Sequence, residues 1–251
     1  MSRRVAILLI AVLASCKSGD SRPSATPTGD NGLDLRRVMV IGASMSAGFG
    51  GTRVDQLMTE TIKAKHVMRA STSIFFSQSA LLTGKRQLDD ARAFKPTLVI
   101  ALDFLFWYAY VNASHAQRTQ RVADALASLQ NVPGRIILGD IADMRGANHQ
   151  MLPPRMVPPR DQLAGFNKQI HAWAKGRTNV HIIPFSAWSA PLQSGGSVVV
   201  KAGTPAIPAT TLLAPDRLHP NAAGMRYIVR RLVENLLNAF PDTAKNALRS
   251  N

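Results

Sequence analysis

Hydrophobic residues along this chain gather in short continuous runs that are separated by amphipathic stretches. The runs at residues 37–42, 97–102, 135–139 and 180–184 are strongly apolar, and residues 66–70 form a weaker one. Apolar runs of this length are typical of parallel strands that are covered on both faces. Between the runs, four segments place apolar residues at helical spacing: residues 52–65, 117–130, 161–175 and 222–239.

This alternation predicts an α/β fold, a three-layer α/β/α sandwich around a mainly parallel five-stranded sheet of flavodoxin-like type. Two irregular segments interrupt it. Residues 149–159 contain Pro153, Pro154, Pro158 and Pro159, which exclude a regular element there. Residues 193–211 are rich in Gly, Val and Thr and predict a small hairpin.

The N-terminus has the pattern of an export signal rather than of a folded element. Residues 2–4 form a short basic region with Arg3 and Arg4, and residues 5–13 are apolar but too short to span a bilayer stably. Small residues then precede Cys16, the only cysteine. This resembles the lipobox of a bacterial lipoprotein, which implies a signal peptide at 1–15 and a lipidated Cys16. An ordinary secretory signal, or a buried apolar segment with a chance cysteine, is the alternative.

Residues 17–33 contain almost nothing apolar and predict a flexible tether, so that residues 16–34 connect the anchor to a globular domain at 35–251. With 251 residues and 46% apolar residues, the chain can form one domain with a sizeable core. Its formal net charge is +15. Such a charge favours anionic membrane surfaces, or is simply a solvated basic surface. The sequence contains no basic run with interleaved aromatic residues, so nucleic-acid binding is not predicted.

Candidate chemistry lies at the two ends of the predicted domain. Asp216 precedes His219 by three residues on the turn into the last helix, and Ser44 follows the first strand. A carboxylate against one imidazole nitrogen leaves the other free to accept the proton of a serine. Taken alone, Ser44 is better explained as an N-cap residue of the first helix, and His219 can be a surface histidine; their occurrence at opposite ends of the α/β pattern favours the catalytic interpretation.

These segments resemble two sequence blocks of the SGNH (GDSL) hydrolases. Residues 42–48 read Gly-Ala-Ser-Met-Ser-Ala-Gly, where the family usually has G-D-S-x-S-x-G, with Ala43 in place of aspartate. Asp216-x-x-His219-Pro220 is similar to the last block. The resemblance covers about residues 36–240. It implies that Ser44 is the nucleophile, His219 the general base and Asp216 the residue that orients the histidine.

The chain departs from this family where the oxyanion is bound. Ile74 stands about where the family has a glycine, and the resemblance implies the backbone N–H groups of Ser44 and Ile74 as donors. No asparagine is in register after the third strand, and Asn112 comes a few residues late. Loss of one oxyanion donor typically costs about 10²- to 10³-fold in turnover.

An aromatic run follows the third strand. Phe104, Phe106, Trp107 and Tyr110 either line an apolar acyl pocket beside Ser44 or belong to the core beneath a loop. Asp103, just before them, is either a structural cap or a carboxylate of the site. The sequence leaves both pairs of alternatives open.

No metal or organic cofactor is expected. The remaining histidines lack metal-ligand spacing, and Asp140, Asp143 and His149 are better explained as a polar loop. The glycines near Ser44 lack the lysine and the spacing of a phosphate-binding loop.

Together these features predict a lipid-anchored ester hydrolase of the bacterial cell envelope, at the outer membrane or the periplasmic face. Its substrate would be an ester-bearing small molecule, a lipid or an acylated glycan. An O-acyltransferase with the same acyl-enzyme, and a non-catalytic envelope binding protein on a degenerate fold, are the alternatives.

Overall fold

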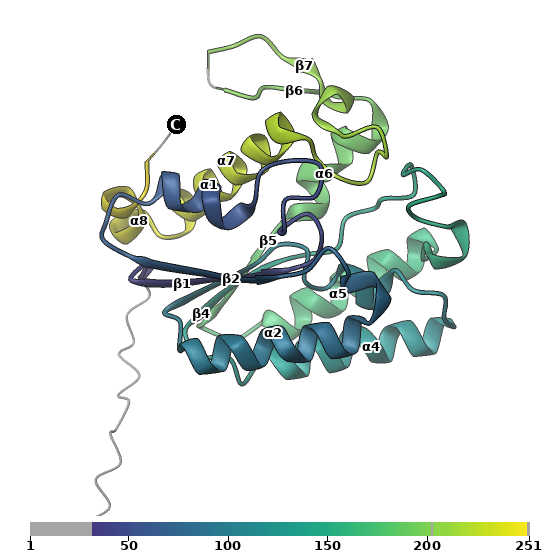
Figure 1. Ribbon diagram of the computed structural model, residues 1–251, viewed down its shortest axis with the longest axis horizontal. Helices are drawn as coiled ribbons and strands as arrows, with labels where there is room; N and C mark the ends of the chain where they lie inside the picture. Colours follow the sequence, from purple (N-terminus) through teal and green to yellow (C-terminus); the bar gives the residue numbers. More distant parts are fainter. Residues whose placement is uncertain (1–31, 202, 250–251) are drawn as a thin grey trace, which may run out of the picture. The chain divides into compact units, whose positions relative to one another are not determined.

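The structure, a computed structural model, describes residues 32–201 and 203–249 (Figure 1). The predicted signal peptide, Cys16 and nearly all of the predicted tether lie outside these residues. Among the helices that are described, none is long and apolar enough to cross a membrane.

A five-stranded parallel sheet forms the middle layer, with the strand order β2-β1-β3-β4-β5. The strands are β1 Arg37–Gly42, β2 Val67–Thr72, β3 Leu98–Ala101, β4 Arg135–Gly139 and β5 Val180–Ile183. Every residue of β3 is buried, whereas β2 and β5 are partly exposed along their length. The weakest predicted strand, β2, is an edge strand with no buried position, and it contains Arg69, Ser71 and Thr72.

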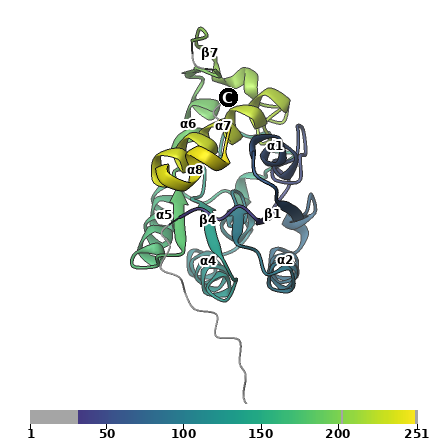
Figure 2. The same ribbon diagram turned by 90° about the vertical axis from the view of Figure 1, so that its left-hand side faces the viewer.

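Helices cover both faces of the sheet, which confirms the predicted three-layer sandwich (Figures 1 and 2). One face carries α1 Val54–Thr61, α7 Ala222–Ala239 and α8 Pro241–Ala247, and the other carries α2 Ala80–Phe94, α4 His115–Leu129 and α5 Arg160–Ala174. The remaining short helices are α3 Phe106–Ala109, α6 Phe185–Ser194 and three 3₁₀ turns, at Phe76–Gln78, Pro154–Met156 and Ala209–Leu212. The 3₁₀ turn at Pro154–Met156 is the one regular turn of the proline-rich segment.

Helices α2, α3, α6 and α8 were not predicted, and two of them, α2 and α6, each contain a residue that usually disfavours helix. Gly84 lies within α2, and Pro191 lies within α6. Gly84 is required by packing, since a Cβ there would lie 1.8 Å from the hydroxyl oxygen of Tyr108. The predicted hairpin is confirmed as the antiparallel pair β6 Ser197–Val198 and β7 Ile207–Pro208.

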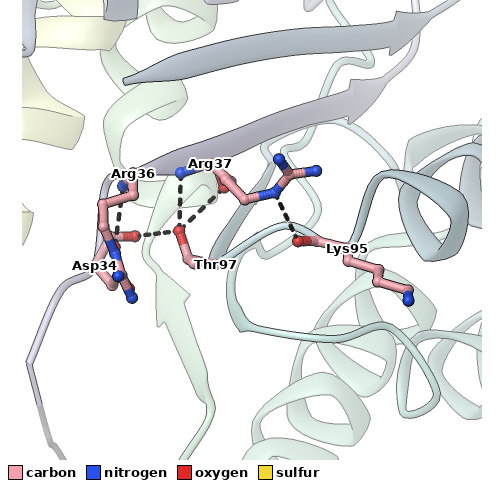
Figure 3. A network of polar contacts seen from close by, with 5 residues as sticks. All are labelled: Asp34, Arg36, Arg37, Lys95 and Thr97. Atoms are coloured by element: carbon pink, nitrogen blue, oxygen red, sulfur yellow. Dashed lines mark hydrogen bonds and ion pairs between the residues drawn. The ribbon is translucent and has the colours of Figure 1, made fainter. Parts of the chain in front are cut away.

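A polar network fixes the N-terminal ends of β1 and β3 side by side (Figure 3). The Thr97 hydroxyl donates to the Asp34 carbonyl oxygen at 2.9 Å and accepts from the Arg37 N–H at 3.0 Å. Arg37 also donates through Nε to the Lys95 carbonyl oxygen at 3.1 Å. Since the two strands start together and run parallel, the turns that leave their carboxyl ends lie next to each other.

The strand order reverses between β1 and β3. From β1 the chain crosses to β2 on one side, and it then returns to β3 on the other side. In open α/β sheets, ligands bind in the crevice outside the carboxyl ends of the strands at such a reversal. Ser44 follows β1 and Asp103 follows β3, so both residues lie at this position.

Candidate active site

Ser44, His219 and Asp216 form a hydrogen-bonded series at the carboxyl end of β1. The Ser44 Oγ lies 2.7 Å from His219 Nε2, and His219 Nδ1 lies 2.7 Å from Asp216 Oδ2. With Nδ1–H donating to the carboxylate, Nε2 is left to accept the serine proton. His219 is only 3% exposed, which keeps this exchange away from bulk water. The structure thus brings together three side chains that are up to 175 positions apart in the sequence.

The Asp216–His219 turn holds the carboxylate in place through the backbone. Asp216 Oδ1 accepts from the N–H groups of Leu218 at 2.9 Å and His219 at 3.0 Å. Arg217, which lies between Asp216 and Leu218, adopts a left-handed φ of 55° that closes the turn. Burial raises the pKa of the Asp216 carboxyl, but the hydrogen bonds from His219 and Leu218 outweigh it, and the pKa lies below its ordinary value. Asp216 therefore remains an anion that can stabilise a charged imidazole.

Asp103 holds the turn on which Ser44 sits. Its Oδ1 accepts from the Ala43 N–H at 2.9 Å and from the Ser46 hydroxyl at 2.6 Å, and its Oδ2 accepts from the Ser46 N–H at 3.2 Å. Burial raises the pKa of the Asp103 carboxyl above its ordinary value, although these hydrogen bonds act in the opposite direction. Of the two alternatives left by the sequence, Asp103 is a cap of the serine turn, and it also lines the cavity beside Ser44.

Gln87 on α2 supports the same turn from the other side, and no sequence pattern singled it out. Its side-chain amide donates to the Gly42 carbonyl oxygen at 2.8 Å and accepts from the Gly42 N–H at 3.0 Å. Gln87 is fully buried, so its amide needs these partners for its hydrogen bonds, whereas the Gly42 carbonyl oxygen also accepts from the Ser73 N–H at 3.2 Å. A polar residue at a buried helix position is the signal that could have identified it.

Gly42 lets the Asp103 carboxylate approach the backbone, and we expect Gly42→Ala to destabilise the protein. A Cβ at this position would lie 2.2 Å from Asp103 Oδ1 and 2.6 Å from Ser46 Oγ. Overpacking of a filled site costs about 1–3 kcal/mol, and here it also displaces the Ser44 turn. Urea unfolding would measure the loss. Gly165→Ala is the matched control, because nothing lies within 4 Å of a Cβ there and α5 should gain up to about 1 kcal/mol. Equal stability of the two variants would contradict the expected clash.

A small cavity of about 30 Å³ lies beside Ser44 and His219. Phe106 and Trp107 line it, whereas Phe104 and Tyr110 do not and are fully buried. The Tyr110 hydroxyl donates to the Ala142 carbonyl oxygen at 2.8 Å and accepts from the Met144 N–H at 2.9 Å. The aromatic run is thus divided between the cavity and the core. Phe49 does not line the cavity but contacts the imidazole of His219, with the two ring centroids 4.5 Å apart.

Two backbone N–H groups are the oxyanion donors that the sequence resemblance implies. In the described part of the chain, neither the Ser44 N–H nor the Ile74 N–H has a hydrogen-bond acceptor. Ile74 follows β2 and is 46% exposed, and its side chain does not line the cavity at Ser44. Its bulk therefore leaves that cavity open. Across residues 32–201 and 203–249, no group of three or more His, Cys, Asp or Glu side chains is arranged to hold a metal ion.

Neither the family models nor the curated proteins contain a match to this sequence. Solved structures do resemble it. A candidate acylhydrolase from Bacteroides fragilis has a TM-score of 0.55 and 14% identity, over 82% of this chain and 88% of that protein. The acetylxylan esterase Axe2 from Geobacillus stearothermophilus has a TM-score of 0.51 and 16% identity, over 80% and 94%.

A GDSL-like lipase from Bacteroides thetaiotaomicron also matches, with a TM-score of 0.51 and 15% identity over 81% of this chain and 89% of that protein. The match to all three spans most of each protein, so the likeness concerns the whole domain rather than one motif. This chain therefore has the α/β/α fold of the GDSL-like hydrolases.

Proposed function

We propose that this protein is a serine ester hydrolase in which Ser44, His219 and Asp216 are the catalytic residues. The observation that carries the proposal is the continuous hydrogen bonding from Ser44 Oγ through the His219 ring to Asp216, each step at 2.7 Å. A serine hydroxyl is a weak nucleophile until an adjacent base accepts its proton. The backbone N–H groups that donate to Asp216, and the hydrogen bonds that hold the serine turn, keep His219 and Ser44 within hydrogen-bond distance of each other.

In the proposed reaction, His219 Nε2 takes the Ser44 proton while Oγ attacks the ester carbonyl carbon. The tetrahedral intermediate collapses, the bond to the alcohol oxygen breaks, and His219 returns the proton to that oxygen. Water then attacks the acyl group on Ser44 by the same sequence and releases the acid. Asp216 stabilises the positive imidazole in both halves, and the N–H groups of Ser44 and Ile74 donate to the oxyanion.

The cavity beside Ser44 favours short acyl groups. Its volume of about 30 Å³ is far below the several hundred Å³ of a typical small-molecule pocket. A short acyl group such as acetyl is therefore the proposed acyl part, on an ester-bearing small molecule or an acylated glycan. The acetylxylan esterase among the structural neighbours acts on a substrate of the second kind.

A panel of aryl esters from acetate to octanoate tests this proposal, with a fluorophosphonate as a label for the nucleophile. We expect the full-length protein to be labelled and kcat/KM to fall steadily as the acyl chain lengthens. Labelling without turnover would instead indicate an acyl acceptor other than water. Absence of both signals across the panel would contradict the hydrolase.

We also propose that the protein is exported and anchored through a lipid on Cys16. The support is the order of basic, apolar and small residues ahead of that cysteine. Metabolic labelling with palmitate is the test. The label should be incorporated by the natural chain and lost in Cys16→Ser, and equal labelling of both would contradict the anchor.

A further inference from the structure

A second and much larger recess lies between α1, α7 and the segment that follows β6, away from Ser44. Its volume is about 620 Å³, and it shares no lining residue with the cavity beside Ser44. Figure 1 shows α1 and α7 next to each other on one face of the sheet, with the β6–β7 hairpin beyond them. The hairpin segment is joined to α7, since Arg230 donates to the Val199 carbonyl oxygen at 2.6 Å. We refer to this recess as the α1–α7 groove.

The floor of the α1–α7 groove is apolar. It is formed by Leu57 from α1, by Val229, Val233 and Leu237 from α7, and by Val200 after β6. Leu57, Val229 and Val233 are almost fully buried, so the apolar surface that still faces water comes mainly from Val200 and Leu237. An apolar partner that covers such surface stabilises it by about 25 cal/mol per Å². The volume is in the range of pockets that hold one drug-sized molecule, which corresponds to a single acyl chain rather than to two.

Basic side chains outnumber acidic ones around this floor. The basic lining residues are Lys201, Arg226, Arg230 and Arg249, and the acidic ones are Glu60 and Glu234. Both carboxylates are already engaged, because Glu60 pairs with Arg226 at 3.5 Å and Glu234 pairs with Arg230 and Arg231. In the part of the chain that the structure describes, Lys201 and Arg249 have no carboxylate partner.

This combination selects the chemistry of the occupant. A neutral apolar ligand would use the floor but leave the excess positive charge without compensation. A polar anion such as free phosphate would use the charge but leave the floor in water. A ligand with one apolar chain and one anionic head satisfies both at once.

We propose that the α1–α7 groove binds a fatty acid with a chain of about twelve carbons, with its chain along α1 and α7 and its carboxylate at Lys201 and Arg249. Such a site is separate from the ester chemistry proposed for Ser44. Its ligand is a single-chain carboxylate, not a macromolecular surface.

Calorimetric titration of the full-length protein with dodecanoate, below its micelle concentration, tests the proposal. We expect one site that binds dodecanoate at least tenfold more tightly than dodecyltrimethylammonium, which has the same chain length and the opposite charge. Lys201→Glu/Arg249→Glu should weaken dodecanoate binding by tenfold or more. Both side chains are exposed, so the fold should tolerate the change.

The control is Lys168→Glu/Lys175→Glu, which makes the same change of net charge on and just after α5, at exposed positions in the opposite helix layer. The affinity of this control variant for dodecanoate should equal that of the unmodified protein. An equal loss of dodecanoate affinity in both double variants would overturn the proposal. Leu237→Trp, which fills the groove, should abolish binding while leaving fluorophosphonate labelling of Ser44 unchanged. Absence of dodecanoate binding, or dodecanoate protection of Ser44 from the label, would also overturn it.

Discussion

Replacement of Ser44 by alanine is expected to lower ester turnover by about 10⁴- to 10⁶-fold, which is the range for loss of a serine nucleophile. The variant should fold normally, because the Ser44 Oγ has a single hydrogen-bond partner among the described residues, His219 Nε2 at 2.7 Å. The measurement is kcat/KM on aryl acetate, together with far-UV circular dichroism to verify the fold.

His219→Ala supplies the control for this expectation. If Ser44 and His219 act as one unit, each single variant removes nearly all of the turnover, and the double variant is little slower than either. Independent, multiplicative losses would show that the two residues do not share one proton transfer. Full activity in either single variant would exclude the proposed catalytic residues.

Replacement of Asp103 by alanine is expected to lower the free energy of unfolding by about 3–5 kcal/mol. The variant leaves three buried donors without their acceptor, namely the Ala43 N–H, the Ser46 N–H and the Ser46 hydroxyl. Each buried donor left unsatisfied costs about 1–3 kcal/mol. Since small domains have only about 5–15 kcal/mol of stability, urea unfolding should detect the loss easily.

Asp103→Asn separates the shape of this residue from its charge. It keeps one acceptor oxygen, so its loss of stability should be smaller than that of the alanine variant. Because burial raises the pKa of Asp103, the folded state of the natural protein favours the protonated carboxyl more than the unfolded state does. The protonated Asp103 carboxyl therefore adds to the free energy of unfolding at low pH. The natural protein should lose this contribution as pH rises from the ordinary pKa of aspartate to the raised one. Asn has no such titration.

The stability difference between the natural protein and Asp103→Asn should then shift in favour of the variant as pH rises through that window. Urea unfolding at several pH values measures it, and the lowered pKa of Asp216 cancels because both proteins contain that residue. A difference that is constant with pH would contradict the raised pKa. Unchanged stability of Asp103→Ala would show that its hydrogen bonds do not hold the serine turn.

Local patterns in the sequence were sufficient for the sheet and for part of the site. The strands β1, β3 and β4 are apolar runs apart from the arginine that begins β1 and β4, because a strand covered on both faces is apolar at its buried positions. Asp216 and His219 could be paired from sequence because they lie three positions apart in one turn. Ser44 could be identified from the glycine-bounded motif at residues 42–48, because this motif directly follows the first strand, where the chain must turn.

The tertiary structure decided everything that depends on contacts across the sheet. Asp103 meets the serine turn from 57 and 60 positions away, and Gln87 meets Gly42 from 45 positions away, so the partners of both residues are set by the tertiary fold. Helix α2 contains Gly84, which disfavours helix, because close packing against Tyr108 leaves no room for a side chain at that position. The division of the aromatic run, with Trp107 at the cavity and Phe104 in the core, follows from how the chain turns after β3. The α1–α7 groove likewise exists only because two helices far apart in sequence pack side by side, which no periodicity within either helix specifies.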